Sequence, residues 1–183
     1  MIEKTNENSL SMKIGETDFF EISGTWKLSF PKGFGAPQSA EFPQLISWTE
    51  SSVPGIRYFS GIARYEIEFD FEKINKNKSF LLNPGDVKDL ADIKLYGDNL
   101  GVIWHPPFEM DITNHLREGK NQMAIEDANL LNKHLVGDDK LPGKRRVTNT
   151  NIVKGPIAWM KPWDEVPLKE FGLMETVVIK TIN

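Results

Sequence analysis

The residues most able to do chemistry in this sequence are its carboxylates, and their spacing selects no catalytic pair. Cleavage of a glycosidic bond needs two Asp or Glu side chains about 5 to 10 Å apart. The chain has 26 Asp and Glu residues. Most of them occupy the polar positions of alternating segments, as Glu66, Glu68 and Asp70 do, which is typical of a solvent-facing strand. The sequence therefore predicts no catalytic residue.

Other catalytic and metal-binding patterns are missing from the sequence as well. It has no Cys, which excludes disulfides, thiolate metal sites and a Cys nucleophile. Its three histidines, His105, His115 and His134, lack the spacing of zinc ligands. Asp138 and Asp139 could hold a structural cation with loop carbonyls, although a paired acidic turn is usually only a turn. We expect neither a cofactor nor a metal.

Two groups of aromatic residues have the composition of a sugar-binding surface. An aromatic ring can stack on the apolar face of a pyranose, with polar side chains beside it for the hydroxyls. Trp104, His105 and Phe108 form one group, and Trp159 and Trp163 form the other. The alternative for Trp104 and Phe108 is packing under the Pro-Pro turn, and for Trp159 and Trp163 it is covering the core.

The second aromatic group lies in a long segment without periodicity, residues 137–169. This segment carries four prolines and the basic run Lys144-Arg145-Arg146. A loop of this length tends to be functional or packed against another surface. We predict that it forms the functional surface together with the turn at 104–108. The candidate carbohydrate-binding or interface residues are Trp104, His105, Phe108, Arg145, Trp159 and Trp163.

Length and charge limit the class of protein. A chain of 183 residues suits one domain, which we place at residues 19–183 after a polar lead-in at 1–18. The formal charge of −4 and the pI near 5.5 argue against a general binder of nucleic acid or anionic membranes. The first residues lack the apolar region of a signal peptide, and no apolar run is long enough to span a membrane.

Alternating hydrophobicity dominates the chain. Tyr65, Ile67, Phe69 and Phe71 alternate with charged residues, which predicts a strand with one buried face. Trp26, Leu28 and Phe30 share the face of an earlier strand, and we assign Trp26 and Trp48 to the core. In all, eight or nine short strands separated by turn signals predict an all-β fold, an antiparallel β-sandwich.

Several connections also have clear signals. Gly97-Asp98-Asn99 predicts a hairpin turn between strands at 93–96 and 100–104. Residues 55–61 are expected to open the strand that contains Tyr65. Thr113 is expected to cap a single helical turn ending at Leu116.

Residues 91–121 follow the order A-x-I-x-L-x-G-x-x-L-G-x-x-W-x-P-P-F-x-x-D-I-T-x-x-L-x-x-G-x-N, which resembles the sugar-binding β-sandwich of glycoside hydrolase family 2 and its relatives. S-W-T at 47–49 and G-I-R-Y-F-S-G-x-A-x-Y at 55–65 resemble the sandwich of family 106-type α-L-rhamnosidases most. Residues 129–138 are similar to the pattern N-x-W-x-N-R-x-I-G-D, but Leu131 replaces its Trp and Lys133-His134 replaces its Asn-Arg. The resemblance covers residues 24–181.

The resemblance implies a jelly-roll sandwich of the galactose-binding-domain type. It implies a non-catalytic, sugar-binding accessory domain of an α-L-rhamnosidase-like or β-galactosidase-like enzyme. In such enzymes the catalytic carboxylates lie on a separate (β/α) barrel, so the implied partners are a carbohydrate and that barrel. A periplasmic or extracellular location fits such a parent enzyme. The alternatives are a free-standing carbohydrate-binding module and an enzyme in its own right.

Overall fold

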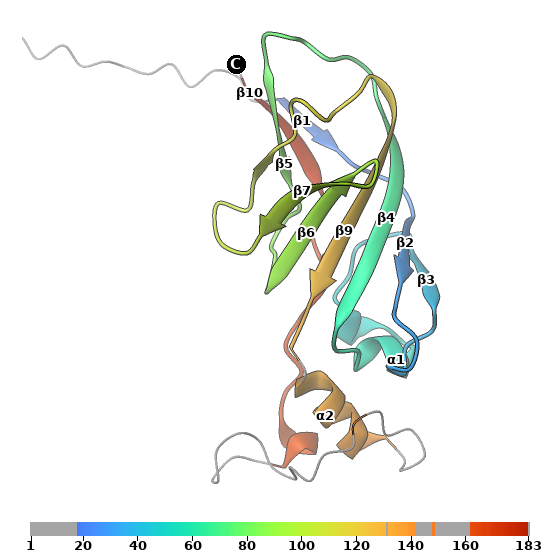
Figure 1. The fold of residues 1–183 in the computed structure, drawn as a ribbon. Coiled ribbons are helices and arrows are strands. Elements are labelled where there is room, and N and C mark those ends of the chain that lie inside the picture. Colours follow the sequence, from blue (N-terminus) through green and yellow to red (C-terminus); the bar gives the residue numbers. More distant parts are fainter. Residues whose placement is uncertain (1–17, 131, 142–147, 149–161, 183) are drawn as a thin grey trace, which may run out of the picture.

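The computed structural model describes residues 18–130, 132–141, 148 and 162–182. Its strands form two antiparallel sheets that face each other (Figure 1). The six-stranded sheet has the order β3-β2-β4-β9-β6-β7, and the four-stranded sheet has the order β1-β10-β5-β8. The predicted all-β antiparallel sandwich is therefore confirmed.

The larger sheet is built around the two longest strands, β4 (Ile62–Phe71) and β9 (Gly119–Ala128), which pair along their full length. Its other strands are β2 (Trp26–Ser29), β3 (Ser39–Phe42), β6 (Leu90–Leu95) and β7 (Asp98–Ile103). The smaller sheet comprises β1 (Asp18–Glu21), β5 (Ser79–Asn83), β8 (Met110–Asp111) and β10 (Val178–Ile182).

The two inner faces enclose a core rich in aromatic side chains. On β4, Tyr65, Ile67, Phe69 and Phe71 are buried, as their alternation predicted. Trp26, Leu28, Phe30 and Trp48 are buried too. Edge-to-face contacts join many of these rings, such as Phe30 with Trp48 and Phe71 with Phe80. The assignment of Trp26 and Trp48 to the core is confirmed.

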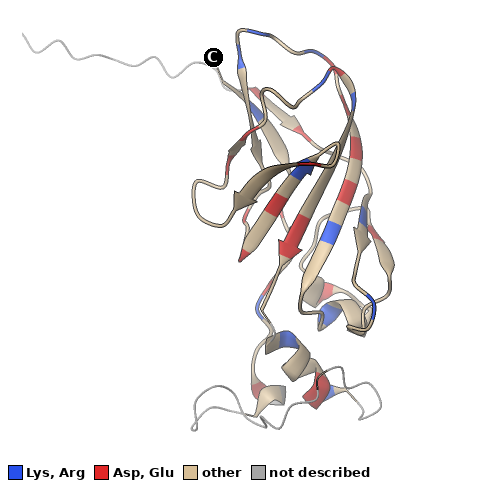
Figure 2. Ribbon diagram, viewed as in Figure 1, with Lys and Arg blue, Asp and Glu red and all other residues tan. Residues whose placement is uncertain are grey.

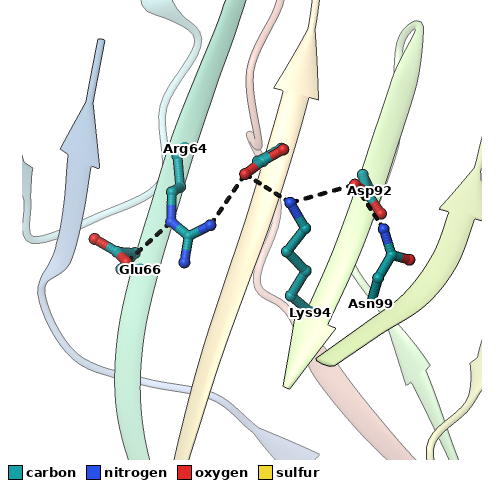
Figure 3. A network of polar contacts seen from close by, with 6 residues as sticks. Arg64, Glu66, Asp92, Lys94 and Asn99 are labelled. Atoms are coloured by element: carbon teal, nitrogen blue, oxygen red, sulfur yellow. Dashed lines mark hydrogen bonds and ion pairs between the residues drawn. The ribbon is translucent and has the colours of Figure 1, made fainter. Parts of the chain in front are cut away.

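The outward face of the larger sheet carries a line of ion pairs that crosses three strands (Figures 2 and 3). Arg64 donates to Glu66 and to Glu126 of β9, with both N···O distances at 3.0 Å. Lys94 of β6 reaches Glu126 at 2.8 Å and Asp92 at 3.5 Å. Hydrogen bonds from Lys94 and Arg64 hold the pKa of Glu126 below its usual value.

The expected strand at 55–61 is wrong, because a short helix, α1 (Pro54–Arg57), occupies this stretch and β4 begins at Ile62. Pro54 stands at the first helical turn, where its fixed φ suits a helix and its missing N–H costs nothing. A 3-10 turn, η1 (Trp48–Glu50), precedes it.

The hairpin turn lies one residue earlier than predicted, at Tyr96 and Gly97 between β6 and β7. Both residues have positive φ, 53° and 87°, as a two-residue hairpin turn of type I′ requires.

The cap before Leu116 also differs from the prediction. Asp111 Oδ1 accepts from the Thr113 N–H at 2.9 Å, while the Thr113 hydroxyl accepts from the Phe80 N–H.

A second helix, α2 (Asn132–Lys140), overlaps the segment at 137–169 that was predicted to lack regular structure. Its buried positions include Lys133, His134 and Asp138. Because these polar residues share the buried face with only Val136 and Gly137, the helix has no apolar period that a sequence could show. The 3-10 turn η3 (Trp163–Glu165) packs against α2. No helix in the described ranges is long and apolar enough to cross a membrane.

Candidate functional site

The predicted turn at 104–108 presents two of its three candidate residues to solvent. Trp104 is 65% exposed, and its ring meets His105 edge to face with a centroid distance of 4.6 Å. Phe108 is half-buried and packs against the core. Packing under the turn, the alternative reading, thus describes Phe108 but not Trp104.

The other candidate residues lie in a different place or outside the described residues. Trp163, on η3, is buried and belongs to the α2 end of the molecule, away from the turn after β7 (Figure 1). Arg145 and Trp159 fall outside the residues that the structure describes. The structure therefore brings Trp104 and His105 together and leaves Trp163 apart from them.

A hollow of about 450 Å³ opens between the loop after β2, helix α1 and helix α2. None of the candidate residues that the structure describes, Trp104, His105, Phe108 and Trp163, lines it. Its lining is mainly apolar and aromatic, with one carboxylate and one imidazole among the described lining residues. The lining consists of Phe34, Gly35, Pro37, Val53, Pro54, Gly55, Tyr58, His134, Gly137, Asp138 and Leu141.

Two glycines allow the three walls of this hollow to approach one another. A Cβ on Gly55 would come within 2.2 Å of the Gly35 carbonyl oxygen, so α1 touches the β2–β3 loop through bare backbone. A Cβ on Gly137 would lie 2.6 Å from the Cβ of Tyr58. Neither contact leaves room for a side chain, so these glycines define the shape of the hollow.

His134 fixes the floor of the hollow. Its ring stacks on Phe34 with a centroid distance of 6.1 Å and an interplanar angle of 17°. Its Nε2 lies 3.2 Å from the Ser60 N–H nitrogen and 3.1 Å from the Phe34 carbonyl oxygen. Depending on the tautomer, Nε2 either accepts a hydrogen bond from the Ser60 N–H or donates one to the Phe34 carbonyl oxygen. Burial lowers the pKa of His134, so the ring is neutral at pH 7.

Asp138 lies at the α2 side of the hollow. Its Oδ2 accepts from the Thr148 N–H at 2.8 Å and also from the Thr148 hydroxyl. Asp138 is therefore engaged in positioning residue 148. Within the described ranges, no group of three or more His, Asp or Glu side chains is arranged to hold a metal ion.

Beside the hollow, Lys133 extends from α2 into the protein. The side chain is 1% exposed, and its Nζ lies 3.5 Å from the centre of the Phe171 ring. Burial lowers the pKa of Lys133 to about 7, against the opposing effect of Asp127 and Asp89. Burial likewise raises the pKa of Asp127 to about 7. The two groups form a buried, titratable pair.

Asn129 joins this end of β9 to the α1 side of the hollow. Its side chain accepts from the Gly61 N–H at 2.8 Å and donates to the Phe59 carbonyl oxygen at 3.1 Å. Asn129, Lys133 and His134 all belong to the motif at 129–138. The motif at 129–138 is the sequence feature that could have pointed to the hollow. The sequence does not show, however, that this motif packs against residues 34 and 58.

The arrangement suits binding better than bond cleavage. An exposed ring, Phe34, faces a concave space with a few polar groups at its edge, the usual composition of a small-molecule site. Asp138 is the one carboxylate among the described lining residues, so this hollow lacks the paired carboxylates of a glycosidase.

Comparison with known proteins places this fold among glycoside hydrolases. No family model matches the chain. The chain is 35% identical over 123 residues to "Putative beta-glucuronidase" of Formosa agariphila, a match that covers 66% of this chain and 11% of the relative. The chain thus corresponds to a small part of that protein.

Solved structures also match nearly the whole of this chain over a small part of their own length. A rhamnosidase from Novosphingobium sp. PP1Y matches 96% of this chain with a TM-score of 0.79 and 29% identity, over 16% of its own length. A β-glucuronidase from uncultured Clostridium sp. matches 100% of this chain with a TM-score of 0.62 and 18% identity, over 30% of its length. The resemblance inferred from the sequence is confirmed: this chain has the β-sandwich fold that is found in a rhamnosidase chain and in β-glucuronidase chains.

Proposed function

We propose that this chain acts as a non-catalytic accessory domain of a glycoside hydrolase, where it frames the substrate cleft or braces a catalytic barrel. The observation that carries this proposal is the coverage of the comparisons. Nearly the whole chain matches a rhamnosidase, but it accounts for only 16% of that chain. A fold with so small a share of a hydrolase serves as one of its domains, beside the part that performs the chemistry.

The carboxylates on the outward face of the larger sheet support a non-catalytic role. Glu66 and Glu126 are ion-paired with Arg64 on an open sheet face, and Glu68 accepts a hydrogen bond from Gln122. A general acid for glycoside cleavage needs a pKa raised by an enclosed site, whereas the pKa of Glu126 is lowered. These carboxylates make ion pairs and hydrogen bonds on the sheet surface.

Exposed apolar residues at one end of the larger sheet support contact with the rest of such a protein. Ile62 and Leu90 both lie opposite Ala128 in the strand register. Trp104 follows Ile103, which pairs with Ala91, so it reaches the level of Leu90. Ile62 is 57% exposed and Leu90 37%. A row of this kind beside an ion-pair network has the composition of an interface, here with a neighbouring hydrolase domain.

Hydrolysis assays test the non-catalytic role directly. The purified chain should not release nitrophenol from aryl α-L-rhamnosides, β-D-galactosides or β-D-glucuronides above the buffer rate, because Glu66 and Glu126 are ion-paired on the sheet face and the described lining of the hollow holds one carboxylate, Asp138. Turnover that one carboxylate substitution abolishes would show that the chain is an enzyme.

The hollow beside α2 favours a free-standing carbohydrate-binding module as the second candidate. The two roles differ in their dependence on a barrel. The accessory role requires that the reading frame be continuous with a barrel-encoding stretch or that the chain bind a separately produced barrel. A free-standing module would bind sugar with its full affinity when no barrel is attached or bound.

A further inference from the structure

We propose that the hollow between the β2–β3 loop, α1 and α2 is a binding site for a neutral pyranose unit. The inference rests on the proposed role in a carbohydrate-active protein and assigns that role to a specific place. The residues predicted from the sequence, on the 104–108 turn and on η3, lie elsewhere.

The dimensions of the hollow fit one sugar ring. Its volume of about 450 Å³ lies in the range of small-ligand sites. The close approaches at Gly55 and Gly137 are fixed by backbone and by the Tyr58 side chain, so the walls are built before any ligand arrives. A site that is already formed loses little conformational entropy on binding.

Phe34 supplies the platform. Its side chain is 43% exposed although its ring is supported from below by His134 and from the side by Phe59. The His134 ring is held in turn through Nε2, which bonds to the Ser60 N–H or to the Phe34 carbonyl group, and the His134 backbone N–H donates to the Ser60 hydroxyl. An exposed aromatic ring with such support offers a rigid face for the C–H groups of a pyranose.

The remaining lining determines which sugars are accepted. Pro37, Val53, Pro54 and Leu141 give apolar walls, and the Tyr58 hydroxyl can serve a sugar hydroxyl at the rim. No Lys or Arg occurs among the described lining residues. Among these described residues, the carboxylate of a uronic acid would meet the Asp138 carboxylate and no cation, so its loss of water would not be offset. The chemistry favours a neutral pyranose over its uronate.

Nuclear magnetic resonance titration of the whole chain tests this assignment. The probes are methyl glycosides of L-rhamnose, D-galactose, D-mannose, D-glucose and D-glucuronic acid. The last two differ only at C6, as alcohol and carboxylate. We expect at least one neutral glycoside to shift the backbone amide signals of Gly35, Gly55 and Gly137, and we expect the glucuronide to bind more weakly than the glucoside.

Two phenylalanine variants locate the site. Phe34→Ala should weaken binding about tenfold, since it removes the stacking platform. Phe19→Ala is the matched control, because Phe19 is 62% exposed on β1 in the other sheet, and it should bind like the wild type. If Phe34→Ala lowers the melting temperature, Val53→Glu gives a second test. Val53 lines the hollow and is 42% exposed, so the introduced glutamate carboxylate should obstruct the apolar wall.

Each outcome decides the assignment. Binding that is unchanged in Phe34→Ala and Val53→Glu, or shifts confined to residues away from the hollow, would show that the sugar binds elsewhere and would leave the accessory role intact. No binding of any glycoside would refute the site. Equal affinity for glucoside and glucuronide would refute the preference for a neutral ring.

Discussion

At the scale of single residues, Tyr65 connects three parts of the chain inside the core. It is fully buried on β4, and its hydroxyl oxygen accepts from the Trp48 indole N–H and from the Leu173 N–H at 3.1 Å. Burial is the main cause that raises the pKa of Tyr65, so the hydroxyl stays protonated at all ordinary pH values. Gly172 passes beside it, where a Cβ would lie 2.6 Å from the tyrosine oxygen.

Tyr65→Phe should lower the free energy of unfolding by about 1 to 3 kcal/mol, because it leaves two buried donors without an acceptor. Urea unfolding followed by tryptophan fluorescence would measure this loss. Tyr58→Phe is the matched control, since Tyr58 is only half-buried at the hollow, and it should change stability by less than about 0.5 kcal/mol. Equal effects of the two substitutions would contradict the role given to the Tyr65 hydroxyl.

The sequence predicted part of this arrangement. Tyr65 and Trp48 were assigned to buried positions because alternation and aromatic character are local signals. The hydrogen bond from the Leu173 N–H to the Tyr65 hydroxyl was not predictable, since it joins residues 108 positions apart. The same limit applies to the hollow, in which His134 meets Phe34 across 100 positions. The sequence identified aromatic residues such as Trp104 as candidates. Whether such a ring is supported and lies in a hollow depends on contacts between residues far apart in the sequence, which it does not show.

At the scale of elements, Asn121 sets the start of β9. Its side chain is buried and all its hydrogen-bonding positions are used. Oδ1 accepts from the Tyr96 hydroxyl at 2.6 Å and the Arg117 N–H at 3.0 Å, and Nδ2 donates to the carbonyl oxygens of Arg117 at 2.7 Å and Gly119 at 2.8 Å. One amide thus links the β6–β7 turn to the loop before β9.

Asn121→Asp should destabilise the fold by roughly 2 to 4 kcal/mol, because the carboxylate keeps the acceptor but cannot donate to two carbonyl groups in a buried site. Thermal unfolding followed by circular dichroism would show the loss as a lower melting temperature. Asn77→Asp makes the same change at an exposed turn position and should have a small effect. A melting temperature for Asn121→Asp within a degree or two of the wild type would rule out this anchoring role.

The elements differ in how well their sequences specify them. The β4 strand was predicted because each alternate residue is apolar. The α1 helix was missed because Tyr58 and Phe59 favour a strand, whereas Pro54 suits a first helical turn and Gly55 permits the close contact with Gly35. The α2 helix was missed because its buried face carries Lys133 and His134, which no hydrophobic pattern would place inside.

At the scale of the whole molecule, the burial of Lys133 on α2 and of Asp127 on β9 should make stability depend on pH. Lysine in an unfolded chain has a pKa near 10.4, whereas burial lowers that of Lys133 to about 7. Between these values the unfolded chain binds a proton that the folded chain does not. The free energy of unfolding should therefore rise with pH over this window, by up to about 1.4 kcal/mol per pH unit.

Lys133→Met removes that contribution while keeping an apolar stem of similar length. Urea unfolding at pH 7.5, 8.5 and 9.5 should show the wild type gaining stability relative to Lys133→Met as pH rises. Asp127 has the opposite dependence, with stability falling as pH rises toward its folded pKa of about 7, so measurements above pH 7.5 largely separate the two. Parallel curves for wild type and variant would mean that Lys133 titrates like an exposed lysine.

The position of β10 gives the order in which this protein can fold while it is being synthesised. The strand lies between β1 and β5 in the smaller sheet, yet it leaves the ribosome after all the other described strands. Until then β1 has no partner within that sheet, and β5 pairs with β8 through only Leu81 and Leu82. The larger sheet can assemble first, with its apolar inner face uncovered. A nascent chain must therefore protect Tyr65, Ile67 and Phe69 from other chains until β10 emerges.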